Sequence, residues 1–364
     1  MPVRRKTRQI SIGSVKIGGD APISIQSMTK TDTRDVRRTV QQIRRLEKAG
    51  CEIVRVAVVD EEAARAMAEI RKRIRIPLIA DIHFHYGLAL KAMEAGADGL
   101  RINPGNIGGR DPLRAIVTEA KARSLPIRIG VNAGSLEKDL LERFGGATPE
   151  AMVLSGLRTI EYMEDHGYHL IKVSLKASDV PRTIEAYRLF SKKSDYPLHL
   201  GITEAGIGSA AIVKSSVGIG LLLNKGIGDT LRVSLTGDPV QEVRVGFEIL
   251  GALGIRKRGV EIISCPICGR CEVDLTPIVK KVEKAVQDIL TPVTVAIMGC
   301  VVNGPGEAKE ADIGIAGGKR VGVLFKKGKL VKKVKERDFV SVLVKEIREM
   351  AGDVLNPNIK SISE

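Results

Sequence analysis

The sequence contains no tryptophan, and aromatic residues make up only 3% of its 364 residues. A core with so few aromatic side chains must be built from Ile, Val, Leu and Ala, which suits buried parallel strands covered by helices. The scarcity also counts against binding of single-stranded nucleic acid, because such proteins stack bases on aromatic side chains. We therefore expect an α/β protein that binds no nucleic acid.

Long apolar segments are also missing. No run approaches the roughly 18 apolar residues of a membrane-spanning helix, and residues 1–19 are basic without the continuous apolar stretch of a signal peptide. Five cysteines in such a chain indicate metal binding or catalysis, not a disulfide framework. We expect a cytoplasmic protein that does not contact a membrane.

Basic residues are in excess, with 58 Lys and Arg against 43 Asp and Glu and a formal net charge of +15. They are spread along the chain and mixed with the acids. Two interpretations stay open: the charge serves solubility, or it attracts an anionic substrate or an acidic protein partner.

Short β-branched runs alternate with helical patterns from residue 22 to residue 252. We expect strands at 22–27, 53–58, 77–81, 98–102, 127–131, 170–174, 198–202 and 230–235. Helices are expected at 35–49, 60–73, 86–95, 111–123, 149–166, 179–193, 208–224 and 239–252. This alternation predicts a (β/α)8 TIM barrel. A doubly wound open sheet is the alternative, but no GxGxxG sequence follows an early strand.

The pattern changes after a linker-like segment at 256–260. Beyond it we expect a helix at 277–290, strands at 293–298, 311–316 and 320–325, a basic hairpin turn, and a helix at 336–350. The chain should therefore consist of a barrel, 1–255, and a small α+β domain, 256–364.

Polar residues follow the barrel strands at their C-terminal ends, where TIM-barrel active sites lie. They are Gln26, Ser27, Arg55, Asp81, His83, Arg101, Asn103, Arg128, Asn132, Lys172, Ser174, Glu204, Arg232 and Ser234. Four arginines and a lysine at one mouth would repel one another unless they met an anion, and arginine binds phosphate oxygens in pairs. The sequence therefore predicts a polyanionic ligand.

Two further features of the mouth leave alternatives open. Glu204 is an acid among these cations, and it either balances Arg232 or transfers protons. His83 and His85 have the spacing of metal ligands, but no third histidine is near, so a supporting or packing role is favoured.

Four of the five cysteines belong to the C-terminal domain. Cys265, Cys268 and Cys271 lie in "SCPICGRC", and Cys300 stands alone in "IMGCVVNGPGE". Both zinc and iron–sulfur clusters use C-x2-C pairs. A zinc ribbon would show a second pair, whereas this run resembles ferredoxin spacing. An iron–sulfur cluster is favoured, and a structural zinc module remains the alternative.

Glu307 follows Cys300 by seven residues. We predict a tight turn at Gly304-Pro305-Gly306 that brings Glu307 back towards Cys300. A carboxylate among soft thiolates is a hard ligand that is displaced more readily than sulfur. The alternative is a solvated loop glutamate.

Taken together, these motifs resemble a known family. "QSMT" at 26–29, "ADIHF" at 80–84, "LRINPGNIG" at 100–108, "GITEAG" at 201–206, "CPxCGR" at 265–270 and "MGCVVNGPGE" at 298–307 are similar to the 4-hydroxy-3-methylbut-2-enyl diphosphate synthase (IspG/GcpE) family, in its two-domain bacterial form. The resemblance implies a TIM barrel followed by a reductase-like domain with a [4Fe-4S] cluster. It also implies reductive opening of 2-C-methyl-D-erythritol 2,4-cyclodiphosphate, with electrons from reduced flavodoxin or ferredoxin, in a head-to-tail homodimer.

The resemblance also implies roles for single residues. The cluster ligands fall on Cys265, Cys268, Cys300 and Glu307, and the active-site acid falls on Glu204. The family's diphosphate-binding residues fall on Arg55, Arg101, Asn103, Arg128, Asn132, Lys172, Arg232 and Ser234, with Asp81 and His83 as further candidates. Cys271 departs from the family pattern, in which its position is usually not cysteine.

Overall fold

The computed structural model describes residues 3–300 and 304–352. The chain divides into two compact units, Met1–Arg256 and Lys257–Glu364. The sequence-based boundary lay one residue earlier, after residue 255. Within the described ranges, no helix combines the length and apolar character of a membrane span.

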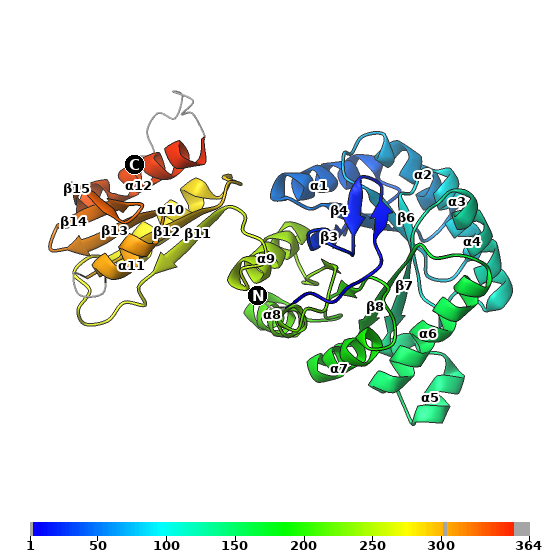
Figure 1. Cartoon of the computed structure of the whole chain (residues 1–364). Coiled ribbons are helices and arrows are strands. Elements are labelled where there is room, and N and C mark those ends of the chain that lie inside the picture. The colour runs from blue at the N-terminus through cyan, green and yellow to red at the C-terminus, as the bar shows by residue number, and fades with distance from the viewer. Residues whose placement is uncertain (1–2, 301–303, 353–364) are drawn as a thin grey trace. The chain divides into compact units, whose positions relative to one another are not determined.

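The first unit is built around a ring of parallel strands (Figure 1). The strands are β3 (Ser24–Met28), β4 (Ile53–Ala57), β5 (Leu78–Asp81), β6 (Gly99–Ile102), β7 (Ile127–Asn132), β8 (Ile171–Lys176), β9 (His199–Leu200) and β10 (Thr230–Leu231). Each pairs with its neighbour in chain order, β10 pairs back with β3, and a single bridge between Val173 and Leu198 links β8 to β9. The predicted TIM barrel is confirmed.

Helices surround this ring. They are α1 (Val36–Ala49), α2 (Glu61–Arg71), α3 (Tyr86–Glu94), α4 (Arg110–Ala122), α6 (Pro149–Asp165), α7 (Val180–Ser191), α8 (Gly208–Asn224) and α9 (Pro239–Ala252). A 3-10 turn, η1 (Ala133–Ser135), and a short helix, α5 (Lys138–Phe144), were not predicted. Both lie in the loop after β7, so they extend the wall of the barrel mouth.

Helix α1 illustrates why these segments fold as they do. The Asp35 side chain accepts a hydrogen bond from the backbone N–H of Arg38 at 2.9 Å, which satisfies a donor at the helix start. Ile43 and Leu46, three residues apart on one face, are fully buried. Gly50 ends the helix in the left-handed conformation, at φ 98°, which glycine adopts without strain.

An N-terminal hairpin, β1 (Ile10–Ile12) with β2 (Val15–Ile17), closes one end of the barrel. Its isoleucines pack against Ile53 and Ile79, which lie near the starts of β4 and β5. Because apolar side chains fill the N-terminal end, the C-terminal ends of the strands form the open mouth.

The second unit contains one mixed sheet in the order β11-β12-β13-β14-β15. The strands are β11 (Val260–Ser264), β12 (Val293–Met298), β13 (Ile313–Gly318), β14 (Val321–Lys326) and β15 (Lys329–Lys335). Strands β11, β12 and β13 are parallel to one another. Strand β14 is antiparallel to β13, and β15 is antiparallel to β14. Strand β11 begins at the last residue of the predicted linker, and β15 follows the predicted hairpin turn without having been predicted itself.

Helices cover both faces of this sheet (Figure 1). Helices α10 (Leu275–Val286) and α12 (Phe339–Ala351) pack on one face with Val295 and Ile297 of β12, and a 3-10 turn, η2 (Glu336–Asp338), precedes α12. Helix α11 (Gly304–Glu310) packs on the other face against Ala296 and Met298. The alternation along β12 sends successive side chains to opposite layers.

Candidate functional site

Cationic side chains lie inside the barrel on neighbouring strands. Arg101 pairs in register with Arg128, and Arg128 pairs with Lys172, so their positions lie side by side across β6, β7 and β8. Arg55 lies on β4, and the four side chains are 1–8% exposed. The predicted convergence of these cations is therefore present in the fold. Arg128 and Lys172 are, however, the second residues of β7 and β8 and do not lie at the C-terminal ends, where they were predicted.

One buried acid balances part of this charge. Asp81, at the end of β5, lies 3.3 Å from Arg55 Nε and 3.1 Å from Arg101 Nη1. Burial alone would raise the pKa of Asp81, but the two guanidinium groups outweigh it and hold the pKa well below its usual range. Asp81 is therefore a fixed anion that orients two arginines.

Much of the charge has no partner. Arg128 Nε and Nη1 and Lys172 Nζ are buried and make no hydrogen bond within the described part of the chain. Burial, reinforced by neighbouring cations such as Arg55, lowers the pKa values of Arg128 and Lys172 far below their ordinary range. Unpaired buried donors and charges are costly. A bound anion would accept hydrogen bonds from these donors and balance their positive charge.

Lys176 is a member of this group that the sequence analysis missed. It is the last residue of β8, 8% exposed, and it lies on the same face of the strand as Lys172 and Ser174. Burial, followed by Arg128, lowers the pKa of Lys176 strongly. The strand was predicted to end at 174, and continuing the alternation by two residues would have found it. A Cβ at Gly201 would lie 2.6 Å from Lys176 Nζ, so glycine leaves room for this side chain.

Arg232 is held by an acid from a helix. Its guanidinium nitrogens Nε and Nη2 each lie 3.2 Å from a carboxylate oxygen of Glu242 on α9. Lys30 Nζ lies 3.1 Å from the same carboxylate. Glu242 is 1% exposed. The charge partner of Arg232 is thus Glu242 and not Glu204, which removes one alternative for Glu204. Glu242 was not predicted because it lies on a helix and not at a strand end.

Glu204 lies at the mouth and not among the buried cations. It is exposed, and with Asn132 and Arg182 it lines a pocket of about 370 Å³ beside the C-terminal ends of the strands. Its φ of 52° is left-handed, which is strained for a residue other than glycine. Such strain, of order 1–3 kcal/mol, concentrates at functional sites.

Two further predicted mouth residues, Asn103 and His83, lie next to polar side chains. Asn103 donates to Ser135 Oγ at 2.7 Å, and His83 Nε2 lies 3.4 Å from Arg101 Nη1. Ser234 is half-buried, two residues beyond Arg232. His83 and His85 belong to no group of three possible metal ligands in residues 3–300 and 304–352.

Cys265 and Cys300 of the second unit lie just beyond the C-terminal ends of strands β11 and β12. Ser264 of β11 pairs in register with Ile297 of β12, so Cys265 and Cys300 both follow the C-terminal ends of neighbouring parallel strands. The backbone N–H of Glu272 donates to Gly299 O at 2.8 Å and ties the cysteine loop to the end of β12. Across the ranges that the structure describes, no three His, Cys, Asp or Glu side chains form a preassembled metal site.

The loop between the first two cysteines is strained. Ile267 is β-branched and adopts a φ of 59°, a genuine outlier for such a side chain. Cys268 is exposed, and the backbone N–H of Arg270 lowers the pKa of its thiol. A lowered pKa favours the thiolate, which is the metal-binding form.

Cys271 has a different environment. It is half-buried, its Sγ donates to Val273 O at 3.2 Å, and a Cβ on Gly299 would overlap it. The sulfur is thus packed against the end of β12. Cys271 therefore differs from Cys268, whose side chain is exposed.

Glu307 lies on a helix and not after a tight turn, so the predicted turn at 304–306 is wrong. Helix α11 begins at Gly304, and Pro305 falls in its first turn, where a missing N–H costs no hydrogen bond. Glu307 is exposed, and the next residue, Ala308, is buried against the sheet. Motif residues 301–303 lie outside the described residues.

Comparisons with known proteins cover almost the whole chain. The family described as the GcpE TIM-barrel domain matches residues 7–247, and the GcpE protein C-terminal domain matches residues 261–349. One relative, "4-hydroxy-3-methylbut-2-en-1-yl diphosphate synthase (flavodoxin)" of Thermodesulfovibrio yellowstonii, is 62% identical over 95% of this chain and 99% of its own length. A protein of the same name from Caldanaerobacter subterraneus is 60% identical over 96% and 99%.

Among solved structures, the dihydropteroate synthase of Stenotrophomonas maltophilia matches with a TM-score of 0.50 and 13% identity, over 68% of this chain and 98% of that one. At this identity the likeness concerns the barrel fold alone. The two domain matches and the near full-length relatives are decisive: the chain belongs to the GcpE family of 4-hydroxy-3-methylbut-2-en-1-yl diphosphate synthases.

Proposed function

We propose that the protein converts 2-C-methyl-D-erythritol 2,4-cyclodiphosphate into 4-hydroxy-3-methylbut-2-enyl diphosphate, in non-mevalonate isoprenoid synthesis. Two electrons enter, the ring opens where carbon is bound to a diphosphate oxygen, and a hydroxyl leaves as water. One structural observation carries the proposal: buried cations in the barrel mouth exceed the buried acids that face them. A diphosphate supplies the missing negative charge.

The barrel residues bind the substrate in this proposal. Those predicted to do so are Arg55, Arg101, Asn103, Arg128, Asn132, Lys172, Arg232 and Ser234, to which the structure leads us to add Lys176. Arg128 has two buried nitrogens without a hydrogen-bond acceptor, Nε and Nη1, and phosphate oxygens could accept from them. Asp81 and Glu242 hold Arg55, Arg101 and Arg232 in place before substrate arrives, so little reorganisation is needed when charge develops on the leaving oxygen.

We propose Cys265, Cys268, Cys300 and Glu307 as ligands of a [4Fe-4S] cluster. When bound, the cluster supplies the electrons and an iron whose oxygen ligand is displaced more readily than a thiolate. The residues fit this group in three respects. Cys265 and Cys300 follow adjacent strand ends, Cys268 is exposed with a lowered pKa, and strained Ile267 lies between two proposed ligands.

Cys271 is excluded from this ligand set. Its sulfur is engaged by Val273 O and packed against Gly299. Releasing it towards a metal would leave the end of β12 without this packing. We therefore assign Cys271 a structural role.

Glu204 is proposed to transfer protons. It is exposed at the pocket that Asn132, a proposed substrate residue, also lines. From this position it can give a proton to the hydroxyl that leaves as water. His83, beside Arg101 and Asp81, is proposed to orient them.

The proposal includes partners and a compartment. The relatives' printed name specifies flavodoxin, and we propose reduced flavodoxin or ferredoxin as the electron donor of this chain as well. The cysteines need a reducing compartment to remain available as thiolates, which supports a cytoplasmic enzyme. A head-to-tail homodimer is proposed from the family resemblance. Mixing inactive Cys300→Ser and Arg128→Met proteins should then restore activity through mixed dimers, and no recovery would count against it.

Turnover tests the function directly. Anaerobically purified protein should contain about four irons per chain, as a [4Fe-4S] cluster requires. Supplied with a small artificial reductant, it should convert the cyclic diphosphate to 4-hydroxy-3-methylbut-2-enyl diphosphate, identified by mass spectrometry. A colourless zinc protein, or iron-replete protein that forms no product, would sink the proposal.

A further inference from the structure

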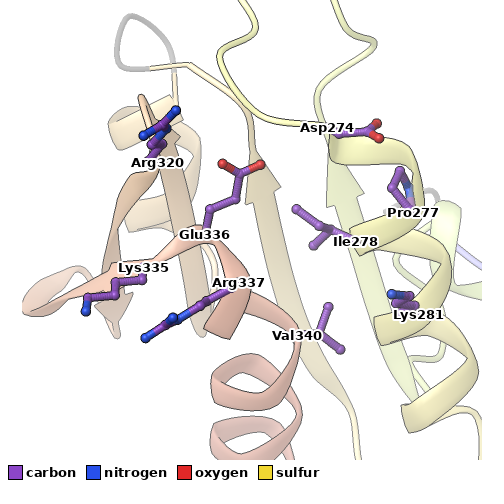
Figure 2. Close-up of a pocket in the computed structure, with 9 residues that line it drawn as sticks. All are labelled: Asp274, Pro277, Ile278, Lys281, Arg320, Lys335, Glu336, Arg337 and Val340. Atoms are coloured by element: carbon purple, nitrogen blue, oxygen red, sulfur yellow. The ribbon is translucent and has the colours of Figure 1, made fainter. Parts of the chain in front are cut away.

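The second unit contains a basic pocket that the proposed chemistry does not use. It has a volume of about 560 Å³ and lies between the start of α10, the turn after β13, the end of β15 and the start of α12 (Figure 2). Its lining residues are Asp274, Pro277, Ile278, Lys281, Arg320, Lys335, Glu336, Arg337 and Val340. Figure 2 shows cations on both sides of it, around the apolar Ile278 and Val340.

The cations of this pocket are exposed and largely uncompensated. Lys281, Arg320 and Lys335 form no ion pair or hydrogen bond through their side chains within residues 3–300 and 304–352. Arg337 forms a loose pair with adjacent Asp338, at 3.9 Å. Two acids, Asp274 and Glu336, also line the pocket, so its four cations leave an excess of positive charge. The surface is therefore suited to an acidic partner.

The surrounding sequence strengthens this charge. Residues 319–337 contain nine Lys and Arg and one acid, Glu336. Glu346 of α12 pairs with Lys326 and Lys332, which neutralises only part of it. Edge strand β15 also exposes Leu330, at 64%.

The pocket lies beside the C-terminal ends of the sheet strands, where the cysteines also lie. Asp274, in its wall, follows Cys271 by three residues. A Cβ at Gly317, near the end of β13, would lie 3.0 Å from the Val273 side chain and 3.2 Å from Met298 O. The pocket's rim and the ends of β12 and β13 are therefore in contact. A partner seated here would lie close to the proposed iron ligands, as electron transfer demands.

The two faces of the sheet separate two tasks. The pocket lies on the face covered by α10 and α12, whereas Glu307 lies on α11, on the opposite face. A protein on the basic pocket would leave the surface around Glu307 accessible. Electrons and substrate can then arrive from different sides.

We propose that this basic pocket, with the β14–β15 edge, is where an acidic electron-carrier protein docks. The inference rests on the proposed function and names the place at which its donor binds. The carrier is oxidised and the enzyme receives the two electrons that the reaction consumes. Complementary charge speeds such transient encounters without requiring tight binding.

Two electron donors distinguish docking from chemistry. Iron-loaded, full-length Lys335→Glu/Arg337→Glu protein would be compared with wild type using reduced flavodoxin and, separately, reduced methyl viologen. The KM for flavodoxin should rise about tenfold or more, because like charges then face each other, and its salt dependence should weaken. Rates with methyl viologen should not change.

Two further variants complete the test. Lys281→Glu, on the exposed side of α10, should also raise the KM for flavodoxin. This single variant keeps the test possible if the double variant does not fold. Lys345→Glu makes the same charge change at an exposed residue of α12 that does not line the pocket, and it should leave the KM close to wild type. An equal effect of Lys345→Glu, no effect of the pocket variants, or equal loss with both donors would overturn the docking site. If wild type makes no product with either donor, the proposed function itself has failed.

Discussion

Arg128 and Lys172 occupy partnered positions on β7 and β8, and each has a buried nitrogen with no hydrogen-bond acceptor in the described ranges. Two groups that are cationic in water are thus held together away from it, where burial disfavours their charged forms. Such an arrangement lowers the stability of the empty protein and raises its affinity for an anion. The barrel mouth is therefore organised for a ligand that brings negative charge.

Removing one of these charges should stabilise the empty protein and weaken the liganded one. Lys176→Met keeps much of the side-chain volume and removes a buried cation, so the free energy of unfolding should rise by roughly 1–3 kcal/mol. Added cyclic diphosphate should stabilise the Lys176→Met protein less than it stabilises wild type. Thermal unfolding with and without ligand measures both effects.

Lys193→Met, at an exposed site after α7, is the matched control and should alter neither quantity. A Lys176→Met protein that is less stable when empty, yet equally stabilised by the cyclic diphosphate, would contradict the assignment of Lys176.

Ligand binding should take up protons. Burial lowers the pKa values of Lys172 and Lys176 from their ordinary value of 10.5. Between the lowered and ordinary values the unfolded chain binds more protons, so the stability of the empty protein should rise with pH in that window. A diphosphate favours the charged lysines and raises their pKa values again.

Calorimetry in buffers of different ionisation enthalpy, at mildly alkaline pH, would detect this uptake on binding. Lys172→Met/Lys176→Met protein should show less of it. Identical proton uptake in wild type and this variant would mean that the lysines do not face the ligand.

Glu242 should be essential for the geometry of Arg232. Glu242→Ala leaves Arg232 and Lys30 without their buried partner, which should cost about 3–5 kcal/mol of unfolding free energy. Glu161→Ala, at an exposed position on α6, should stay within about 0.5 kcal/mol of wild type. Denaturant unfolding of the two variants gives the comparison, and equal stability would show that the pair contributes little.

The two cysteines near β12 should behave differently. Cys271→Ser should keep iron and most activity, because its sulfur packs against Gly299 and donates to Val273 O. Cys300→Ser should lose both, since Cys300 is a proposed ligand. The iron content and the visible absorption spectrum of each variant show whether it holds the cluster. Iron loss in Cys271→Ser protein would require a different ligand set.

The barrel was predictable because its pattern is local. Each strand is a short β-branched run and each helix repeats apolar residues at spacings of three or four, as Ile43 and Leu46 do. Arg101 lies near the end of its strand as predicted, whereas Arg128 is the second residue of β7 and joins the group through its register with Arg101. These positions follow from period-two alternation and the parallel geometry of a barrel.

Other features depended on tertiary contacts that local patterns do not contain. Glu242 reaches the mouth from a helix, and Lys176 lies two residues past the predicted end of its strand. Glycine and proline at 304–306 suggested a turn, but the buried face of α11, at Ala308, stabilises a helix there. Packing against the sheet outweighed the local preference.

Electron paramagnetic resonance would show directly whether substrate held by the barrel residues reaches iron. The electron paramagnetic resonance spectrum of reduced, iron-loaded protein would be recorded before and after addition of the cyclic diphosphate. We predict a changed spectrum in wild type and an unchanged one in Arg128→Met protein of equal iron content. A wild-type spectrum that does not respond to the cyclic diphosphate would contradict the account.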